Sequence, residues 1–126
     1  MLLRWLRRRS SAARAAIETE VGSGAYLAGP EHGSYRGGNG RFSRVKGNSW
    51  IALTHDRLLV RPFVGKPISV PLSEITATRI AKTWLGSWTA GVKVLVISTE
   101  SGELGIAVRD PAAWQAVLPG RPEPSS

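Results

Sequence analysis

The sequence predicts a mainly β domain closed by a single C-terminal helix, and three observations lead to this fold class. Apolar residues alternate with other residues at a period of two through most of residues 41–118, which is typical of half-buried strands. Gly, Pro, Asn and Asp interrupt these runs at short intervals, as tight turns require. The segment 110–118 carries a helix pattern instead. Short antiparallel strands joined by tight turns favour a sandwich or a barrel.

Seven strands follow from the alternation and the turns. They are expected near 41–46, 49–54, 57–64, 68–72, 76–85, 92–99 and 103–109. One face of each strand should be buried, and a shift by one residue would exchange the two faces. The predicted core consists of Ile51, Leu53, Leu58, Val60, Ile68, Val70, Leu72, Ile75, Val94, Val96, Leu104, Ile106, Val108, Trp114 and Leu118.

The chain divides into four parts by composition. Residues 1–20 form a basic amphipathic N-terminal segment, and residues 21–40 hold seven glycines and are expected to be a linker. Residues 41–118 are the predicted domain, whose helix begins at Asp110, a good N-cap, followed by Pro111. Residues 119–126 (PGRPEPSS) are expected to be a disordered tail.

The pair His55-Asp56 is the only mid-chain His-Asp pair. Because consecutive side chains of an extended chain leave opposite faces, the two cannot act together as a base and its orienting acid. We expect a two-residue turn, where Asp bonds its own main chain. The chain also has no cysteine, no Gly-x-Ser-x-Gly elbow and no evident carboxylate pair. The sequence therefore predicts a non-enzymatic protein that needs no cofactor and holds no metal.

The segments GNSWIALTHDRLLV, ISVPLSEITA and VRDPAAWQAVL are similar to the bacterial branch of the pleckstrin-homology-like (PH-like) superfold, which includes GRAM domains. The resemblance covers about residues 41–118. It implies a strongly bent, seven-stranded, partly open barrel capped by one C-terminal helix. It also implies a binding module, because relatives bind phosphoinositides, other membrane lipids or protein segments.

The N-terminal segment is the most basic part of a chain whose net charge is +8. It carries five arginines within residues 1–14 and no acid, and its large apolar residues fall near one helical face. We expect membrane contact through Leu2, Leu3, Arg4, Trp5, Leu6, Arg7, Arg8 and Arg9. A solvated lead-in is the alternative. Removal of residues 1–16 should then abolish binding to anionic vesicles and leave the thermal midpoint nearly unchanged.

Two further sets of residues are candidates for contact. Trp84 is expected in the core, and Trp88 is the better candidate for a surface contact. Lipid-binding relatives carry basic residues on the first two strands around their connecting loop, which implies anion contact by Arg36, Arg41, Arg44 and Lys46. Solvated strand faces are the alternative for these four residues. The loop expected at Gly47-Asn48 is minimal and the next strand has no basic residue, which argues against capture of a specific phosphoinositide.

Two classes of function remain open. One is a peripheral membrane adaptor in the cytoplasm, at the inner face of the membrane. The other is a protein-interaction module that takes a partner segment at a barrel edge or beside the helix. Nucleic acid is less favoured, because only Phe42 lies between basic residues in the way that a nucleic-acid groove requires. The sequence predicts no oligomeric state.

Overall fold

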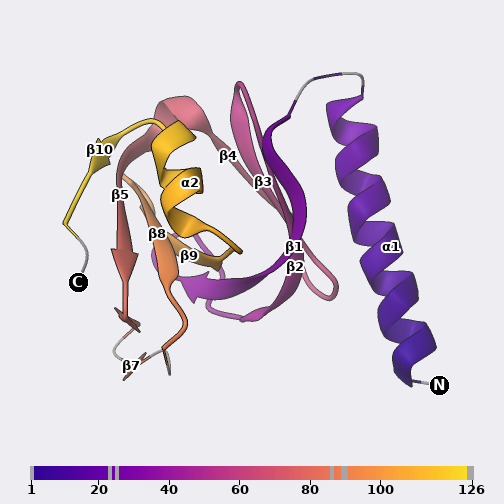
Figure 1. Cartoon of the computed structure of the whole chain (residues 1–126). Coiled ribbons are helices and arrows are strands. Elements are labelled where there is room, and N and C mark those ends of the chain that lie inside the picture. The colour runs from indigo at the N-terminus through magenta and orange to yellow at the C-terminus, as the bar shows by residue number, and fades with distance from the viewer. Residues whose placement is uncertain (1, 23, 25, 86, 89–90, 125–126) are drawn as a thin grey trace.

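The computed structural model describes residues 2–22, 24, 26–85, 87–88 and 91–124. It is mainly β, as the sequence predicts, with one helix before the sheet and one after it (Figure 1). The elements are α1 (Leu2–Val21), β1 (Tyr26–Gly38), β2 (Gly47–Thr54), β3 (Arg57–Pro62), β4 (Ile68–Pro71), η1 (Leu72–Glu74), β5 (Ile75–Ala81), β6 (Thr83–Trp84), β7 (Ser87–Trp88), β8 (Val94–Thr99), β9 (Gly102–Ala107), α2 (Pro111–Val117) and β10 (Arg121–Pro122).

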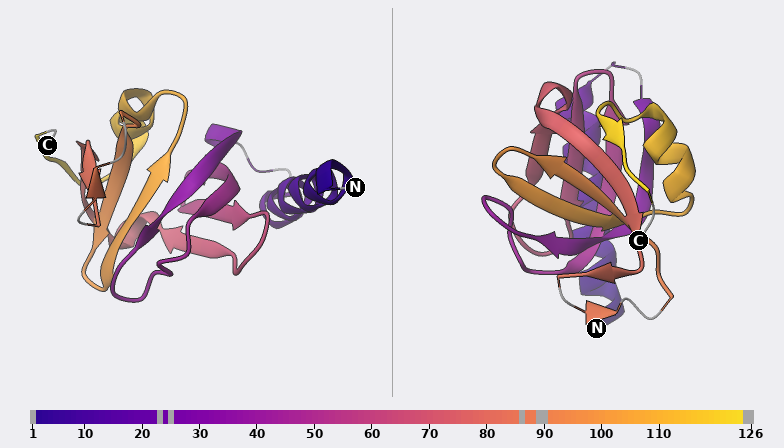
Figure 2. Two further views of the ribbon diagram at one scale, coloured as in Figure 1. Left: turned by 90° about the horizontal axis from the view of Figure 1, so that it is seen from below. Right: turned by 90° about the vertical axis from the view of Figure 1, so that its left-hand side faces the viewer.

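Eight of the described strands form one open sheet in the order β10-β5-β8-β9-β1-β2-β3-β4. All neighbours are antiparallel except β10 and β5, which are parallel. The sheet bends sharply where β1 passes from β2 to β9, so that its two halves face each other across the core (Figure 2, left). The helix α1 lies on the outer side of the β1–β4 half, and α2 lies beside the other half (Figure 2, left).

The first strand corrects the sequence analysis. The expected linker contains the longest strand, β1, whereas the expected strand at 41–46 is part of the connection from β1 to β2. The glycines of β1 have a packing role rather than a linker role. A Cβ at Gly33 would collide with the carbonyl oxygen of Ala107 on β9, and a Cβ at Gly38 would lie 2.6 Å from that of Phe42. Glycine is therefore required where another backbone or side chain approaches closely.

The main core lies between the two halves of the sheet. It holds the expected residues of β2, β3, β4, β9 and α2, with Ile68, Leu72 and Val108 partly buried at its margin. The prediction for β8 was wrong by one residue: Leu95 and Ile97 lie in this core. Val94 and Val96 face the other way and pack under Trp84 in a second cluster. Because both faces of β8 are covered, its sequence could not show which face was inside.

The turn at His55-Asp56 is confirmed as the corner between β2 and β3. The Thr54 hydroxyl donates to Asp56 Oδ1 at 2.7 Å, and the Leu72 amide donates to the Asp56 carbonyl oxygen at 2.9 Å. The hydrogen bond from Thr54 lowers the pKa of the Asp56 carboxyl. His55 is exposed at this corner. Asp56 therefore has a structural role, since its hydrogen bonds fix the turn.

The expected disordered tail is partly ordered. Residues 121–122 form β10, and the Glu123 amide donates to the Thr78 carbonyl oxygen at 2.7 Å. The expected segment 76–85 is also divided, because it forms β5 and then β6, which pairs with β7 in a small separate hairpin.

Candidate functional site

The helix α1 is attached to the domain along its C-terminal half. Ile17 is fully buried against Ala52 and Leu59 on the outer face of β2 and β3, and the Trp50 indole donates to the Ser10 hydroxyl at 2.8 Å. The Arg14 guanidinium lies over the Trp50 ring, 4.9 Å from its centroid. The N-terminal segment is therefore not separate from the domain. Its residues from Ser10 to Val21 belong to the packed structure.

The N-terminal half of α1 has different surroundings. Leu3 is 70% exposed and Trp5 42% exposed, and Leu6 is half-buried. The Arg9 guanidinium lies 5.4 Å from the centroid of the Trp5 ring. Arg4, Arg7 and Arg8 are exposed, whereas the side chain of Leu2 lies outside the described residues. The described contact residues thus form a basic helical end at which Leu3 and Trp5 face water.

Two loops lie at the same end of the molecule. Because Ser10 contacts Trp50 and Ile17 contacts Ala52, α1 runs along β2 in the same direction, and its N-terminus lies at the end where β2 begins (Figure 1). The loop 39–46 enters β2 at that end, and the loop 63–67 leaves β3 there. One small cavity is lined by both loops, and a groove next to it is lined by the second loop and by α1.

We define the basic end as residues 3–9 of α1, residues 44–46 of the first loop and residues 64–66 of the second. Its sequence contains no acidic residue. Val45 is 73% exposed and Val64 is 57% exposed, so each loop carries an apolar side chain next to lysine or arginine. The cations of the basic end are Arg4, Arg7, Arg8, Arg9, Arg44, Lys46 and Lys66. Exposed apolar residues among cations suit an anionic, partly apolar surface.

The four predicted anion contacts outside α1 separate into two pairs. Arg41 is held within the protein, because it pairs with Glu74 at 2.8 Å, donates to Ser101 Oγ at 2.8 Å and lies over the Phe42 ring. Arg36 is half-buried in β1, where its carbonyl oxygen accepts from the Trp84 indole. Arg44 and Lys46 are exposed in the loop 39–46 and belong to the basic end.

The connection between the first two strands is another correction. The sequence predicts a minimal loop at Gly47-Asn48, but the structure has the eight residues 39–46 between β1 and β2. Of the two observations against capture of a specific phosphoinositide, the minimal loop is therefore wrong, whereas the lack of a basic residue on β2 holds. Val64 and Lys66 were not predicted as contact residues, although the short apolar and basic segment FVGK between two strands was a usable signal.

The structure tests the predicted burial of one of the two tryptophans in β6 and β7. Trp84 is buried, as expected, and its indole donates to the carbonyl oxygens of Arg36 and Gly37 at 3.0 and 3.3 Å. It packs over Gly105, where a Cβ would lie 2.7 Å from the indole nitrogen. The side chain of Trp88 lies outside the described residues, so its surface role stays a prediction.

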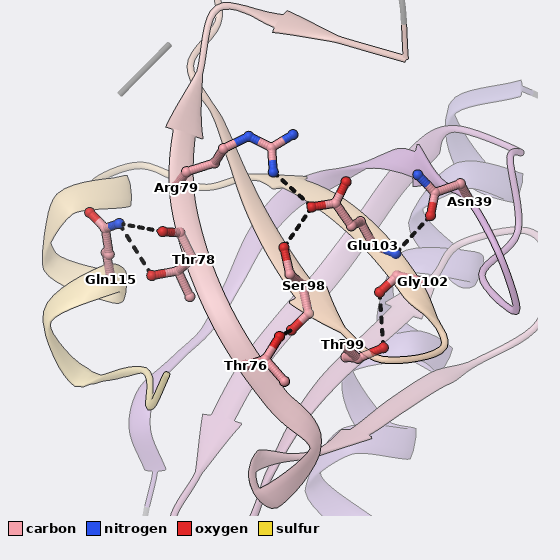
Figure 3. Close-up of polar contacts among 9 residues, drawn as sticks. All are labelled: Asn39, Thr76, Thr78, Arg79, Ser98, Thr99, Gly102, Glu103 and Gln115. Atoms are coloured by element: carbon pink, nitrogen blue, oxygen red, sulfur yellow. Dashed lines mark hydrogen bonds and ion pairs between the residues drawn. The ribbon is translucent and has the colours of Figure 1, made fainter. Parts of the chain in front are cut away.

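A cluster of polar side chains on β5, β8 and β9 is the other candidate (Figure 3). Arg79 and Ser98 donate to the same oxygen of Glu103 at 2.7 and 2.6 Å, and the Glu103 amide donates to Asn39 at 2.8 Å. Burial alone would raise the pKa of the Glu103 carboxyl, but these bonds and the Arg79 charge lower it overall. These polar groups are hydrogen-bonded to one another, and the bond from Glu103 to Asn39 fastens the loop 39–46 to the sheet.

The described residues contain no group of three or more His, Cys, Asp or Glu side chains that could hold a metal. Neither described helix is both long and apolar enough to cross a bilayer. The chain matches no protein-family model and no curated protein sequence. A role for the basic end therefore has to be argued from its own residues.

Proposed function

We propose that this protein is a non-enzymatic, PH-like binding module that attaches peripherally to an anionic membrane through its basic end. The observation that carries the proposal is the combination of Leu3, Trp5, Val45 and Val64, all exposed, with seven cations and no acid at one end of the molecule. In a cell this end would face the inner surface of the membrane from the cytoplasm.

The strand order supports the PH-like part of the proposal. Strands β1–β4 follow one another in one half of the sheet, and β5, β8 and β9 follow one another in the other half. The first strand joins the halves by pairing with both β2 and β9, and the C-terminal helix follows the last of these strands. The resemblance implies a strongly bent sheet of seven strands followed by one helix, and α1, β6, β7 and β10 are additional to these.

The expected binding free energy is sufficient for reversible attachment to a membrane. Each cation near an anionic bilayer contributes about 1 kcal/mol, so seven cations set an upper limit of about 7 kcal/mol. Complete burial of a Leu or Val side chain contributes about 1.5–3 kcal/mol, and the exposed side chains of the basic end reach part of that. The cost of orienting the protein at the surface reduces the sum.

A protein-interaction module without lipid binding is the second candidate. The observation in its favour is a groove between α2 and β10, lined by Ala112, Gln115, Leu118 and Pro122, next to Val117, which is 44% exposed. The groove lies away from the basic end, so a partner there is compatible with membrane attachment as well as with its absence.

Sedimentation with vesicles tests the proposal with two variants of equal charge change. R7Q/R8Q/R9Q removes three cations from the basic end, and K93Q/R109Q/R121Q removes three exposed cations from elsewhere. We expect the first variant to bind anionic vesicles at least tenfold more weakly than the wild type, and the second to change by less than threefold. Equal weakening would show that net charge alone attracts the protein. If the wild type does not bind anionic vesicles, the protein-interaction role is favoured.

A further inference from the structure

The apolar side of α1 is continuous, yet two different surfaces must cover it. With 3.6 residues per turn, Leu3 and Leu6 lie on the same side of the helix as Ala13 and Ile17. Ala13 and Ile17 are buried on the sheet, whereas Leu3 is exposed to water. We propose that α1 is a detachable helix, which leaves the sheet at a membrane and lays its whole apolar side in the bilayer interface. This inference rests on the proposed membrane attachment.

The docked position of α1 prevents flat insertion. A bilayer that covers Leu3 and Leu6 along the helix side would approach from the side that the domain occupies. The loop 63–67 stands in its way, since Gly65 and Pro67 line a groove together with Ala13 and Ala16. Only the tip of the docked helix and the loop side chains reach a flat surface. Docked binding therefore relies on the cations and on the few apolar side chains exposed at the basic end, and flat insertion of the helix requires release.

The attachment of α1 is light for a helix of 20 residues. Ile17 is its only fully buried described side chain, with Ala13 adding a methyl group and Val21 partly buried in the same cluster. Ser10 accepts one hydrogen bond from Trp50, and Arg14 lies over the Trp50 ring. The main core contains no described residue of α1, so release leaves that core intact. Gly22 follows the helix with φ +65°, and a Cβ there would meet nothing within 4 Å. Glycine tolerates backbone angles that are costly for other residues, so the chain can change direction between α1 and β1 at this point.

The surroundings decide which position is stable. Ile17 is shielded from water in both positions, on the sheet or in the bilayer. Release uncovers Ala52 and Leu59 on the sheet and breaks the Trp50 hydrogen bond, which opposes it in water. At a bilayer, burial of Leu3, Trp5 and Leu6 is added while the arginines stay among the anionic headgroups. A ligand shifts such an equilibrium only by its different affinity for the two states, and the bilayer supplies that difference.

A reducible bridge between α1 and the loop tests the release. The chain has no cysteine, so A16C/P67C places the only two thiols on exposed positions of one groove. A short disulfide-containing bifunctional thiol reagent locks the helix in place, and the same variant capped with a monofunctional reagent is the control. We expect the bridged protein to bind phosphatidylglycerol vesicles at least tenfold more weakly than the capped protein, and reduction to restore binding.

The outcomes separate the two proposals. If bridged and reduced proteins bind within twofold of each other, the helix does not need to leave the sheet and the release is wrong. If the capped and reduced proteins do not bind either, the membrane proposal falls, and the release falls with it. Circular dichroism in the near ultraviolet checks that the bridged protein keeps its fold.

A distance measurement tests the release without a bridge. Ala12 on α1 and Ser69 on β4 are both exposed, and A12C/S69C carries one spin label on each. We expect one narrow distance distribution in solution and a broad distribution at longer distances on anionic vesicles. Neutral phosphatidylcholine vesicles serve as the control. An unchanged distribution on vesicles that bind the protein would overturn the release.

Discussion

At Gly33 the backbone of β1 lies so close to β9 that no side chain fits. A Cβ there would collide with the Ala107 carbonyl oxygen, whereas a Cβ at Gly47 would meet nothing within 4 Å. We expect Gly33→Ala to lower the free energy of unfolding by about 1–3 kcal/mol, as forced overpacking does. Gly47→Ala should leave it unchanged or raise it slightly, because it reduces the freedom of the unfolded chain. Urea denaturation measures both, and equal effects would contradict the close approach.

Glu103 makes stability depend on pH. Its pKa is lower in the folded protein, since the bonds from Ser98 and Arg79 outweigh the effect of burial. A lowered carboxyl pKa stabilises the fold above the unfolded pKa of about 4.3, and this contribution is lost as the pH falls through the folded value. We expect the wild type to lose stability from about pH 5 downward, and Glu103→Gln to show a shallower loss over that range.

The matched control for this pH dependence is Glu100→Gln, which removes an exposed carboxylate from the neighbouring turn. It should keep the wild-type slope when unfolding by urea is followed between about pH 3 and pH 7. If Glu103→Gln also keeps that slope, the Glu103 cluster does not contribute the acid sensitivity assigned to it.

The helix α1 has two halves with different roles, and deletion can separate them. Removal of residues 1–9 should leave the thermal midpoint nearly unchanged and weaken vesicle binding strongly. Removal of residues 1–16 should lower the midpoint by several degrees, because Ser10, Ala13 and Arg14 leave the outer face of β2. This replaces the expectation from sequence that residues 1–16 could be removed without effect. Differential scanning calorimetry distinguishes the two deletions.

At the scale of the whole molecule, the basic end predicts attraction to charge rather than to one headgroup. The cavity between the loops 39–46 and 63–67 is only about 30 Å³. Pockets that select a small molecule hold roughly 300 Å³ or more. We expect phosphatidylglycerol and phosphatidylserine vesicles of equal charge density to bind the protein equally, with affinity falling as salt rises and the charges are screened. A preference above about tenfold for one headgroup would contradict this.

The sequence was sufficient to predict the β class, most of the strands and the helix after Asp110, because these depend on local alternation and turn residues. It also determined that the chain's densest positive charge lies with large apolar residues in its first nine positions. Those properties belong to short stretches of chain and need no knowledge of neighbours.

The tertiary structure decided what depends on distant neighbours. The glycines of β1 indicated a linker in sequence, and only the approach of Ala107 and Phe42 shows why a strand needs them there. Val94 and Leu95 are equally apolar, so their faces were decided by Trp84, which covers one side of β8. Arg41 and Arg44 carry the same charge in sequence, and a partner 33 residues away, Glu74, holds one while the other stays exposed. Charge and periodicity are local, whereas which surface is covered is a property of the packed chain.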